Sequence, residues 1–173
     1  MQVVQAVVPL AFVAISLLSR DPEAAKAGGA GQGIGGKDRR PPETIDLRNT
    51  PPTVLFAMDK PVICALNGMA IGGGFEIAMS CDLIIAADHV HFALPEMPLG
   101  IVPDAGALQR LPRLIPRNIA MEMLLLGRKM TAVEAAHYGL VNKVVPKEAL
   151  METARAWADQ IAGSAPLAMQ TVK

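Results

Sequence analysis

The sequence predicts a domain of the α/β class. Two short runs, residues 61–66 (PVICAL) and 82–87 (DLIIAA), are apolar on consecutive residues, as strands buried on both faces are. Between them, three consecutive glycines lead into a stretch that can form a short helix. The unit is therefore strand, turn, helix, strand. If the two strands are parallel, their connection is expected to be a right-handed crossover.

The composition fits a globular domain and excludes several classes of partner. The 173 residues carry 16 Lys and Arg against 16 Asp and Glu, so the formal net charge is zero and gives no electrostatic argument for a nucleic acid. Apolar residues make up 51% of the chain and charged residues 18%, which excludes disorder for most of it and allows a sizeable core. Aromatic residues make up only 3%, so base-stacking platforms and aromatic cages are not expected.

Residues 1–50 differ in composition from the rest and are expected to be an atypical N-terminal segment, with the core in residues 51–173. Residues 3–18 form a nearly unbroken apolar run that is short for a membrane span. No basic residue precedes Arg20, as a secretory signal would require, and an Arg-rich transit bias is also missing. We expect a buried strand or helix of the same domain, in a cytoplasmic protein with no membrane partner. A displaced or wrongly joined beginning is the alternative.

A Gly-rich and then basic stretch, residues 27–42, contains the dinucleotide-binding spacing at Gly31, Gly33 and Gly36. That fingerprint needs a strand before it and a helix after it. Here an Asp-Pro-Glu sequence comes before, and Lys-Asp-Arg-Arg-Pro-Pro comes after, which cannot open a packed helix. We therefore expect a mobile surface loop rather than a nucleotide site.

Two helices are expected soon after residue 100. Asp104 can cap a helix that contains apolar residues at positions 107, 108 and 111. Residues 118–126 can form the next helix, which ends at Gly127 because glycine adopts the left-handed conformation of a C-terminal cap.

The C-terminal part predicts a helix, a strand and a longer helix. Thr131-x-x-Glu134 has the pattern of a capping box, which opens a short helix that Gly139 closes. Residues 140–145 read as a strand, and residues 147–161 as an amphipathic helix. The apolar face of that helix consists of Leu150, Ala154, Trp157, Ala158 and Ile161.

Neither the cysteines nor the histidines form a metal-binding set. Cys64 and Cys81 lie in apolar runs without a partner at ligand spacing, which indicates buried free thiols in a reducing compartment, with a disulfide as the less favoured alternative. His89 and His91 are two residues apart, and His137 falls in the predicted short helix. None has further ligands at metal spacing, so no metal is expected.

The residues suited to chemistry lie between positions 61 and 111. Gly72, Gly73 and Gly74 at the mouth of a helix leave N–H groups free at its positive end, and no Cβ hinders a ligand there. Such a turn suits an oxyanion. A tight turn that needs positive φ is the plainer explanation. Glu76, in the first turn of the helix, could add a carboxylate beside whatever the glycines hold.

Three acidic residues near this turn have apolar neighbours. The helix dipole favours an acid in the first turn by about 0.3 to 1 kcal/mol, but a purely structural acid would lie on a polar face. Glu76 is instead flanked by apolar residues, and burying it unpaired would be costly. Glu96 repeats this situation directly after Pro95. Asp104 follows eight residues later and could simply be a helix cap.

Scattered basic residues follow the acids: Arg110, Arg113, Arg117, Arg128 and Lys129. They could contact a phosphate. A solvated surface is the plainer explanation for cations that are spread in this way.

Residues 61–83, PVICALNGMAIGGGFEIAMSCDL, resemble the signature of the enoyl-CoA hydratase/isomerase family, also called the crotonase family. The match consists of a strand, Asn-Gly, three glycines, an acid two residues after the last glycine, and Cys-Asp-Leu. The resemblance continues through residues 91–113 and 124–146 to Pro166 and covers about two thirds of the chain. Within the family, residues 92–113 are most similar to carnitinyl-CoA dehydratases, which hydrate crotonobetainyl-CoA.

The resemblance implies an α/β, crotonase-like core of ββα-superhelix type that acts on an acyl-CoA thioester, with coenzyme A as part of the substrate and no further cofactor. It also implies that the N–H of Gly73 stabilises the enolate oxygen of the thioester. Gly72, Gly74 and Ala70 would surround that oxygen as oxyanion-hole and substrate-binding residues.

For the acids, the resemblance implies that Glu76 and Glu96 hold and deprotonate a water that attacks Cβ while a proton goes to Cα. Asp104 matches in position an acid of related dienoyl-CoA isomerases, where it would help to move a proton. Hydration of a 2-enoyl-CoA is thus the expected activity. An isomerase that uses Glu96 and Asp104, and a non-catalytic shortened subunit that keeps the fold, are the alternatives.

The chain also departs from the family. Members take a second oxyanion N–H and part of the CoA surface from an upstream Phe-x-Ala-Gly-x-Asp segment, and the nearest candidate, residues 35–38, keeps only Gly-x-Asp. Members also have further N-terminal strands and C-terminal helices that complete a trimer. The sequence therefore resembles the central part of a crotonase, shortened at both ends, which would form a homotrimer or a dimer of trimers if complete.

Overall fold

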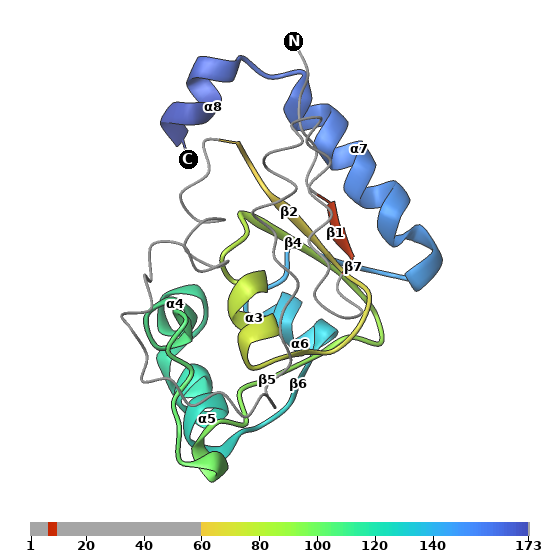
Figure 1. The fold of residues 1–173 in the computed structure, drawn as a ribbon. Coiled ribbons are helices and arrows are strands. Elements are labelled where there is room, and N and C mark those ends of the chain that lie inside the picture. Colours follow the sequence, from red (N-terminus) through yellow and green to blue (C-terminus); the bar gives the residue numbers. More distant parts are fainter. Residues whose placement is uncertain (1–6, 10–59, 173) are drawn as a thin grey trace, which may run out of the picture.

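The computed structural model describes residues 7–9 and 60–172, and the structural statements below concern these residues. Its centre is a parallel sheet with the strand order β1 (Val7–Pro9), β2 (Ile63–Leu66), β4 (Leu83–Ala87) and β7 (Lys143–Val145) (Figure 1). Strands β2 and β4 pair in parallel, with Ile63 opposite Leu83, which confirms the predicted strand pair. All four residues of β2 are buried, as expected of a strand covered on both faces.

A second, three-stranded sheet was not predicted. It consists of β3 (Ala70–Ile71), β5 (His91–Ala93) and β6 (Met130–Thr131), in the order β3, β5, β6. Strand β3 is parallel to β5, and β6 is antiparallel to it. Strands of two or three residues are too short to show a period of two, so hydrophobic patterning does not reveal them.

The helices are α3 (Gly73–Ala78), α4 (Ala107–Leu114), α5 (Arg117–Leu126), α6 (Ala132–His137), α7 (Leu150–Ala162) and α8 (Pro166–Val172), with 3₁₀ turns η2 (Met97–Leu99) and η3 (Lys147–Ala149). Helix α7 packs along β2 and β4, and α6 packs against β6 and β7. Helices α4 and α5 pack against each other and lie beyond α3 from the central sheet (Figure 1). Helix α3 therefore stands between the sheet and this helical pair.

Local patterns in the sequence correctly predicted α5, α6, β7 and α7, whereas α8 was not predicted. The capping box is present: the Glu134 N–H donates to Thr131 Oγ1 at 3.2 Å, and the Thr131 N–H donates to Glu134 Oε2 at 3.1 Å. Helix α5 ends at Gly127, whose φ of 63° is left-handed. On α7, the predicted apolar face packs on the core, with Leu150, Ala154 and Ala158 buried.

The core joins the central sheet to the glycine turn. Phe75 on α3 and Phe92 on β5 are both fully buried, with ring centroids 5.1 Å apart, and they tie α3 to the second sheet. Cys64 is buried and Cys81 half-buried, and both are free thiols, as predicted. A hydrogen bond with Cys81 and burial raise the pKa of the Cys64 thiol, which keeps it protonated and unreactive.

Part of the atypical N-terminal segment belongs to the central sheet. Strand β1 lies within the predicted apolar run and pairs in parallel with β2. The Gly-rich loop at residues 27–42, including the candidate segment 35–38, lies outside the described residues, and the division at residue 50 stays a prediction. Within residues 60–172, no helix has the length and apolar character needed to cross a bilayer.

Candidate active site

The glycine turn forms the entrance of α3. Gly72 is the N-cap residue, with φ 55° and ψ −128°, a backbone conformation that essentially requires glycine. Its N–H donates to the Ala93 carbonyl at 3.0 Å, which attaches the turn to β5. A tight turn with positive φ thus explains Gly72 alone, because Gly73 and Gly74 are already helical.

Gly73 and Gly74 present an open helix terminus. They occupy the first two helical positions, whose N–H groups have no acceptor within the helix, and the N-cap residue, Gly72, makes no side-chain cap hydrogen bond. Among the described residues, a Cβ added at either glycine would meet no atom within 4 Å. Local packing therefore does not require glycine at these two positions, which is consistent with a surface kept clear for a ligand.

Glu76 is buried in the first turn of α3. Its side chain is 3% exposed, which confirms that it does not lie on a polar face. The Ala107 N–H, at the start of α4, donates to Glu76 Oε1 at 3.0 Å. The carboxylate thus lies against the positive end of a second helix, which supplies the partner that a buried acid needs.

The prediction that Asp104 caps α4 is wrong. Asp104 is exposed, and the N-cap residue is Gly106, which makes no side-chain cap hydrogen bond. Gly106 has a φ of 122°, so the chain turns two residues later than a cap at Asp104 would require. Glu76 accepts the first N–H of α4 instead, through a contact between residues 31 positions apart that a search for local caps does not find.

Glu96 lies over the glycine turn. It is half-buried at the start of η2, and its Oε1 would be only 2.7 Å from a Cβ on Gly72. Its Oε2 is buried and has no hydrogen-bond partner among the described residues. A buried carboxylate oxygen without a partner is unusual, so this oxygen can accept a further hydrogen bond.

The three predicted acids lie close enough for the charges of two of them to affect the pKa of Glu76. Burial raises the pKa of the Glu76 carboxyl, and the charges of Glu96 and Asp104 raise it further. The N–H groups of Ala107 and Ala105 lower this pKa and offset part of the increase. Glu76 therefore keeps its proton to a higher pH than an ordinary glutamic acid, as a group in acid–base catalysis needs to.

Replacing Glu76 with glutamine is expected to stabilise the fold near neutral pH. Folding raises the Glu76 pKa above its unfolded value of about 4.3, so the wild-type chain loses stability as the pH rises through the folded pKa. Glutamine does not titrate, and its Oε1 can still accept the Ala107 N–H. Urea unfolding of both proteins between about pH 4 and pH 7 should show a stability difference that grows with pH. A constant difference would contradict this expectation.

A methyl group on Gly72 is expected to displace the Glu96 carboxylate. Gly72→Ala should cost about 1 to 3 kcal/mol of backbone strain and, because Glu96 must move, lower activity on the order of 100-fold. Gly139→Ala is the matched control, since Gly139 also has positive φ, 84°, but no atom of the described residues would lie within 4 Å of the added Cβ. Thermal unfolding and steady-state kinetics should show strain in both variants and loss of activity only in Gly72→Ala.

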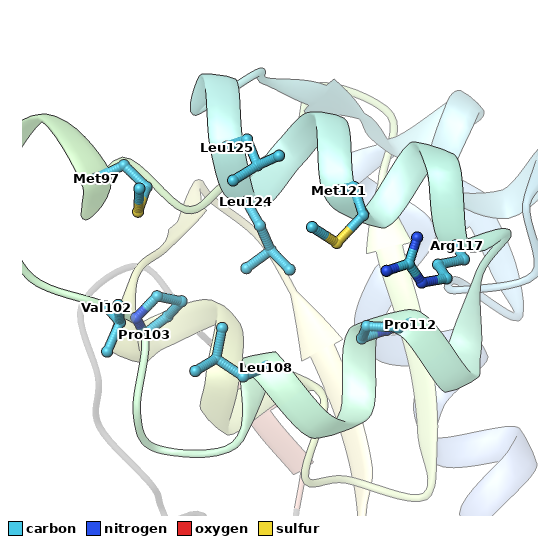
Figure 2. Close-up of a pocket in the computed structure, with 9 residues that line it drawn as sticks. All are labelled: Met97, Val102, Pro103, Leu108, Pro112, Arg117, Met121, Leu124 and Leu125. Atoms are coloured by element: carbon cyan, nitrogen blue, oxygen red, sulfur yellow. The ribbon is translucent and has the colours of Figure 1, made fainter.

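An apolar cavity of about 430 Å³ lies between η2, α4 and α5. Figure 2 shows Met97 and Arg117 toward opposite ends of it. The lining residues are Met97, Val102, Pro103, Leu108, Pro112, Arg117, Met121, Leu124 and Leu125. Two of the residues that line the cavity are sequence neighbours of the acids: Met97 follows Glu96, and Pro103 precedes Asp104. The cavity therefore lies next to the segments that carry these two acids. No motif indicated this cavity, because it arises only when α4 packs on α5.

Histidines and cysteines do not form a metal centre in the described part of the chain. Within residues 7–9 and 60–172, no three metal-ligating side chains come together. His89 Nε2 lies 3.0 Å from the Asn67 carbonyl, and His91 Nδ1 lies 2.9 Å from the His89 carbonyl. These histidine rings therefore contact backbone carbonyls, one directly after β2 and one shortly before β5.

Comparison with known proteins identifies the family. The profile of the family described as enoyl-CoA hydratase/isomerase matches residues 39–173. The chain therefore belongs to the enoyl-CoA hydratase/isomerase family. The curated carnitinyl-CoA dehydratase of Citrobacter koseri is 54% identical over 121 residues, which are 70% of this chain and 46% of that protein. The predicted resemblance to carnitinyl-CoA dehydratases is thus confirmed.

Solved structures confirm the crotonase-like fold. A carnitinyl-CoA dehydratase from Mycobacterium avium is 40% identical with a TM-score of 0.65, over 66% of this chain and 45% of that one. An enoyl-CoA hydratase from Bacillus anthracis is 44% identical with a TM-score of 0.68, over 72% of this chain and 48% of that one. The chain thus spans slightly less than half of the length of these relatives.

Proposed function

We propose that this chain carries the catalytic centre of an enoyl-CoA hydratase, which adds water across the double bond of a 2-enoyl-CoA thioester. One observation carries the proposal: Glu76 and Glu96 converge beside the open N-terminus of α3. Glu76 is buried with a raised pKa, and Glu96 has a buried oxygen without a partner in the described residues. Two acids in one site can give a proton and take another, as addition of water requires.

The glycine turn supplies the electrostatic part of the mechanism. The thioester carbonyl would lie at the start of α3, where the N–H of Gly73 donates to its oxygen. As the nucleophile adds, negative charge develops on that oxygen, and the positive helix end stabilises it. Gly72, Gly74 and Ala70 would surround the thioester oxygen without placing larger side chains beside it. The nearest candidate for a second donor is the upstream segment 35–38, which keeps only Gly-x-Asp of the family pattern.

The two glutamates would handle the water. Its oxygen bonds to Cβ, one of its protons passes to the ionised carboxylate of the pair, and the protonated carboxyl gives its proton to Cα. The sum is addition of one water, with the carboxyl pair carrying one proton before and after the step. Glu96 Oε2, which has no partner among the described residues, would accept a hydrogen bond from the water, and the apolar cavity beside Met97 offers space for an acyl chain.

Names of relatives suggest the acyl group. The proteins from Citrobacter koseri and Mycobacterium avium are named carnitinyl-CoA dehydratases, so we include crotonobetainyl-CoA among the candidate substrates. No cofactor beyond the coenzyme A of the substrate is proposed. We expect the complete protein to be a homotrimer or a dimer of trimers in the cytoplasm.

Isomerisation of an enoyl- or dienoyl-CoA is the second candidate. The observation that favours it is that Asp104 is exposed, is not a helix cap, and acts on the Glu76 pKa through its charge. Asp104 and Glu96 could then move a proton along the acyl chain without adding water. The two reactions differ in whether the double bond disappears.

The test is incubation of the purified chain with crotonyl-CoA and with crotonobetainyl-CoA while the enoyl thioester absorbance is followed. Loss of absorbance with either substrate would support hydration. Solvent proton exchange without loss of absorbance would favour the isomerase. A folded chain that binds CoA but turns over no hydratase or isomerase substrate would contradict both and leave a non-catalytic subunit.

A further inference from the structure

We propose that Arg110 is a positioning residue for Glu76. Its guanidinium holds the loop of residues 104–106 in the one arrangement that directs the first N–H of α4 at the Glu76 carboxylate. The catalytic meaning of this role rests on the proposed function, whereas the positioning itself can be measured without turnover.

The guanidinium of Arg110 contacts the loop of residues 104–106, which directly precedes α4. Its Nη1 donates to the Ala105 carbonyl at 3.1 Å. It also occupies the space above Gly106, where an added Cβ would lie 1.9 Å from Nη1 and 2.9 Å from Cζ. Gly106, at φ 122°, therefore both turns the chain and leaves room for the guanidinium. The backbone N–H of Arg110 donates to the Gly106 carbonyl at 2.9 Å, which closes the first turn of α4 on the same loop.

The peptide held by Arg110 lies between the two N–H donors that Glu76 uses. Ala107 donates its N–H to Glu76 Oε1, and the N–H of Ala105 also stabilises the Glu76 carboxylate. The clamped carbonyl belongs to Ala105, between these two N–H groups along the chain. Because peptide units are planar, fixing the Ala105 carbonyl fixes the direction of the peptide that leads into Gly106. Arg110 thus acts on Glu76 through the backbone.

Helix α4 offers a matched comparison in Arg113. This residue lies three positions after Arg110, and its Nη1 donates to the Gln109 carbonyl within the same helix. Arg113 is exposed, whereas Arg110 is half-buried. Replacing Arg113 removes the same charge from the same helix but leaves the loop intact. The difference between the two replacements therefore separates the effect of the contact between Arg110 and the loop from a general effect of charge.

The direct test is the titration of Glu76, followed by carbon-13 NMR of glutamate-labelled protein and assigned with Glu76→Gln. The acids that face Glu76, Glu96 and Asp104, are unchanged in the variants. Arg110→Ala should move the Glu76 pKa further upward and speed hydrogen exchange of the Ala107 amide, because the carboxylate loses N–H donors. Arg113→Ala should do neither. An unchanged Glu76 titration in folded Arg110→Ala would overturn the proposal.

Kinetics supply the second measurement. Arg110→Ala should lower kcat by roughly 10- to 100-fold with little change in KM, because Glu76 is misplaced while substrate binding is kept. The limb of the pH profile that reports Glu76 should move to higher pH. Arg110→Lys, which keeps one donor for the Ala105 carbonyl, should restore part of both effects, and it decides the question if Arg110→Ala does not fold. Equal effects of the alanine and lysine variants on the Glu76 titration would contradict the proposal that Arg110 acts through its hydrogen bond to the Ala105 carbonyl.

Failure of the proposed function gives a different result. If the wild-type chain hydrates no enoyl-CoA, but Arg110→Ala alone shifts the Glu76 titration, the hydratase assignment falls and the positioning role stands. If hydration proceeds and the titration is the same in all variants, the positioning role falls and the hydratase assignment stands.

Discussion

Replacement of Glu96 with glutamine is expected to lower the rate of enoyl-CoA hydration by roughly 100- to 10,000-fold. Glutamine has the same shape and can still lie over Gly72, but it cannot accept a proton from water or donate one to Cα. The Glu96 Oε2 atom is buried and has no hydrogen-bond partner among the described residues, so we propose it as the acceptor for the reacting water. The measurement is kcat with crotonyl-CoA, together with the dissociation constant of a CoA thioester.

The matched control for this variant is Glu152→Gln. Glu152 is exposed on α7, away from the glycine turn, and its replacement removes the same charge. The control should keep wild-type kcat, and Glu96→Gln should keep the affinity for the thioester. A Glu96→Gln protein that hydrates at the wild-type rate would exclude Glu96 from proton transfer.

Replacement of Gly73 with proline is expected to lower kcat by roughly 100- to 1000-fold, or about 2.7 to 4 kcal/mol in the barrier. Proline is well tolerated at the first position of a helix, where its missing N–H has no helical acceptor. The change therefore removes one proposed oxyanion donor and leaves α3 in place. Circular dichroism and thermal unfolding would establish that the fold is kept.

Gly73→Ala separates the N–H from the side chain. A Cβ at this position meets no described atom within 4 Å, and alanine keeps the N–H. It should therefore lose much less activity than the proline variant. If proline and alanine reduce kcat equally while the fold is kept, the Gly73 N–H is not an oxyanion donor.

Much of the framework could be predicted from sequence because it is encoded locally. The strands around the glycine run, the capping box at Thr131 and the apolar face of α7 all depend on residues within a few positions of one another. The burial of Glu76 could be predicted for the same reason, since its neighbours along the helix are apolar. Each of these predictions is confirmed by the structure.

The partners of the site residues could not be predicted, because they come from distant parts of the chain. Asp104 has the right residue type for a cap, yet Glu76 accepts the first N–H of α4 from 31 residues away. Arg110 resembles a scattered surface cation in the sequence, and only its place above Gly106 indicates another role. The spacing of glycines and acids indicated which residues are candidates for the site, while their hydrogen bonds depend on how α3 packs against α4.

The most direct test of the central proposal is the mass of the product formed from crotonyl-CoA in water labelled with oxygen-18. The proposal predicts that the full chain produces a thioester that has gained one labelled water, with the label on Cβ. It also predicts that this product is formed at least about 100 times more slowly by Glu96→Gln. A folded chain that binds the thioester and returns it without added oxygen would contradict the proposal that Glu76 and Glu96 form a hydratase site.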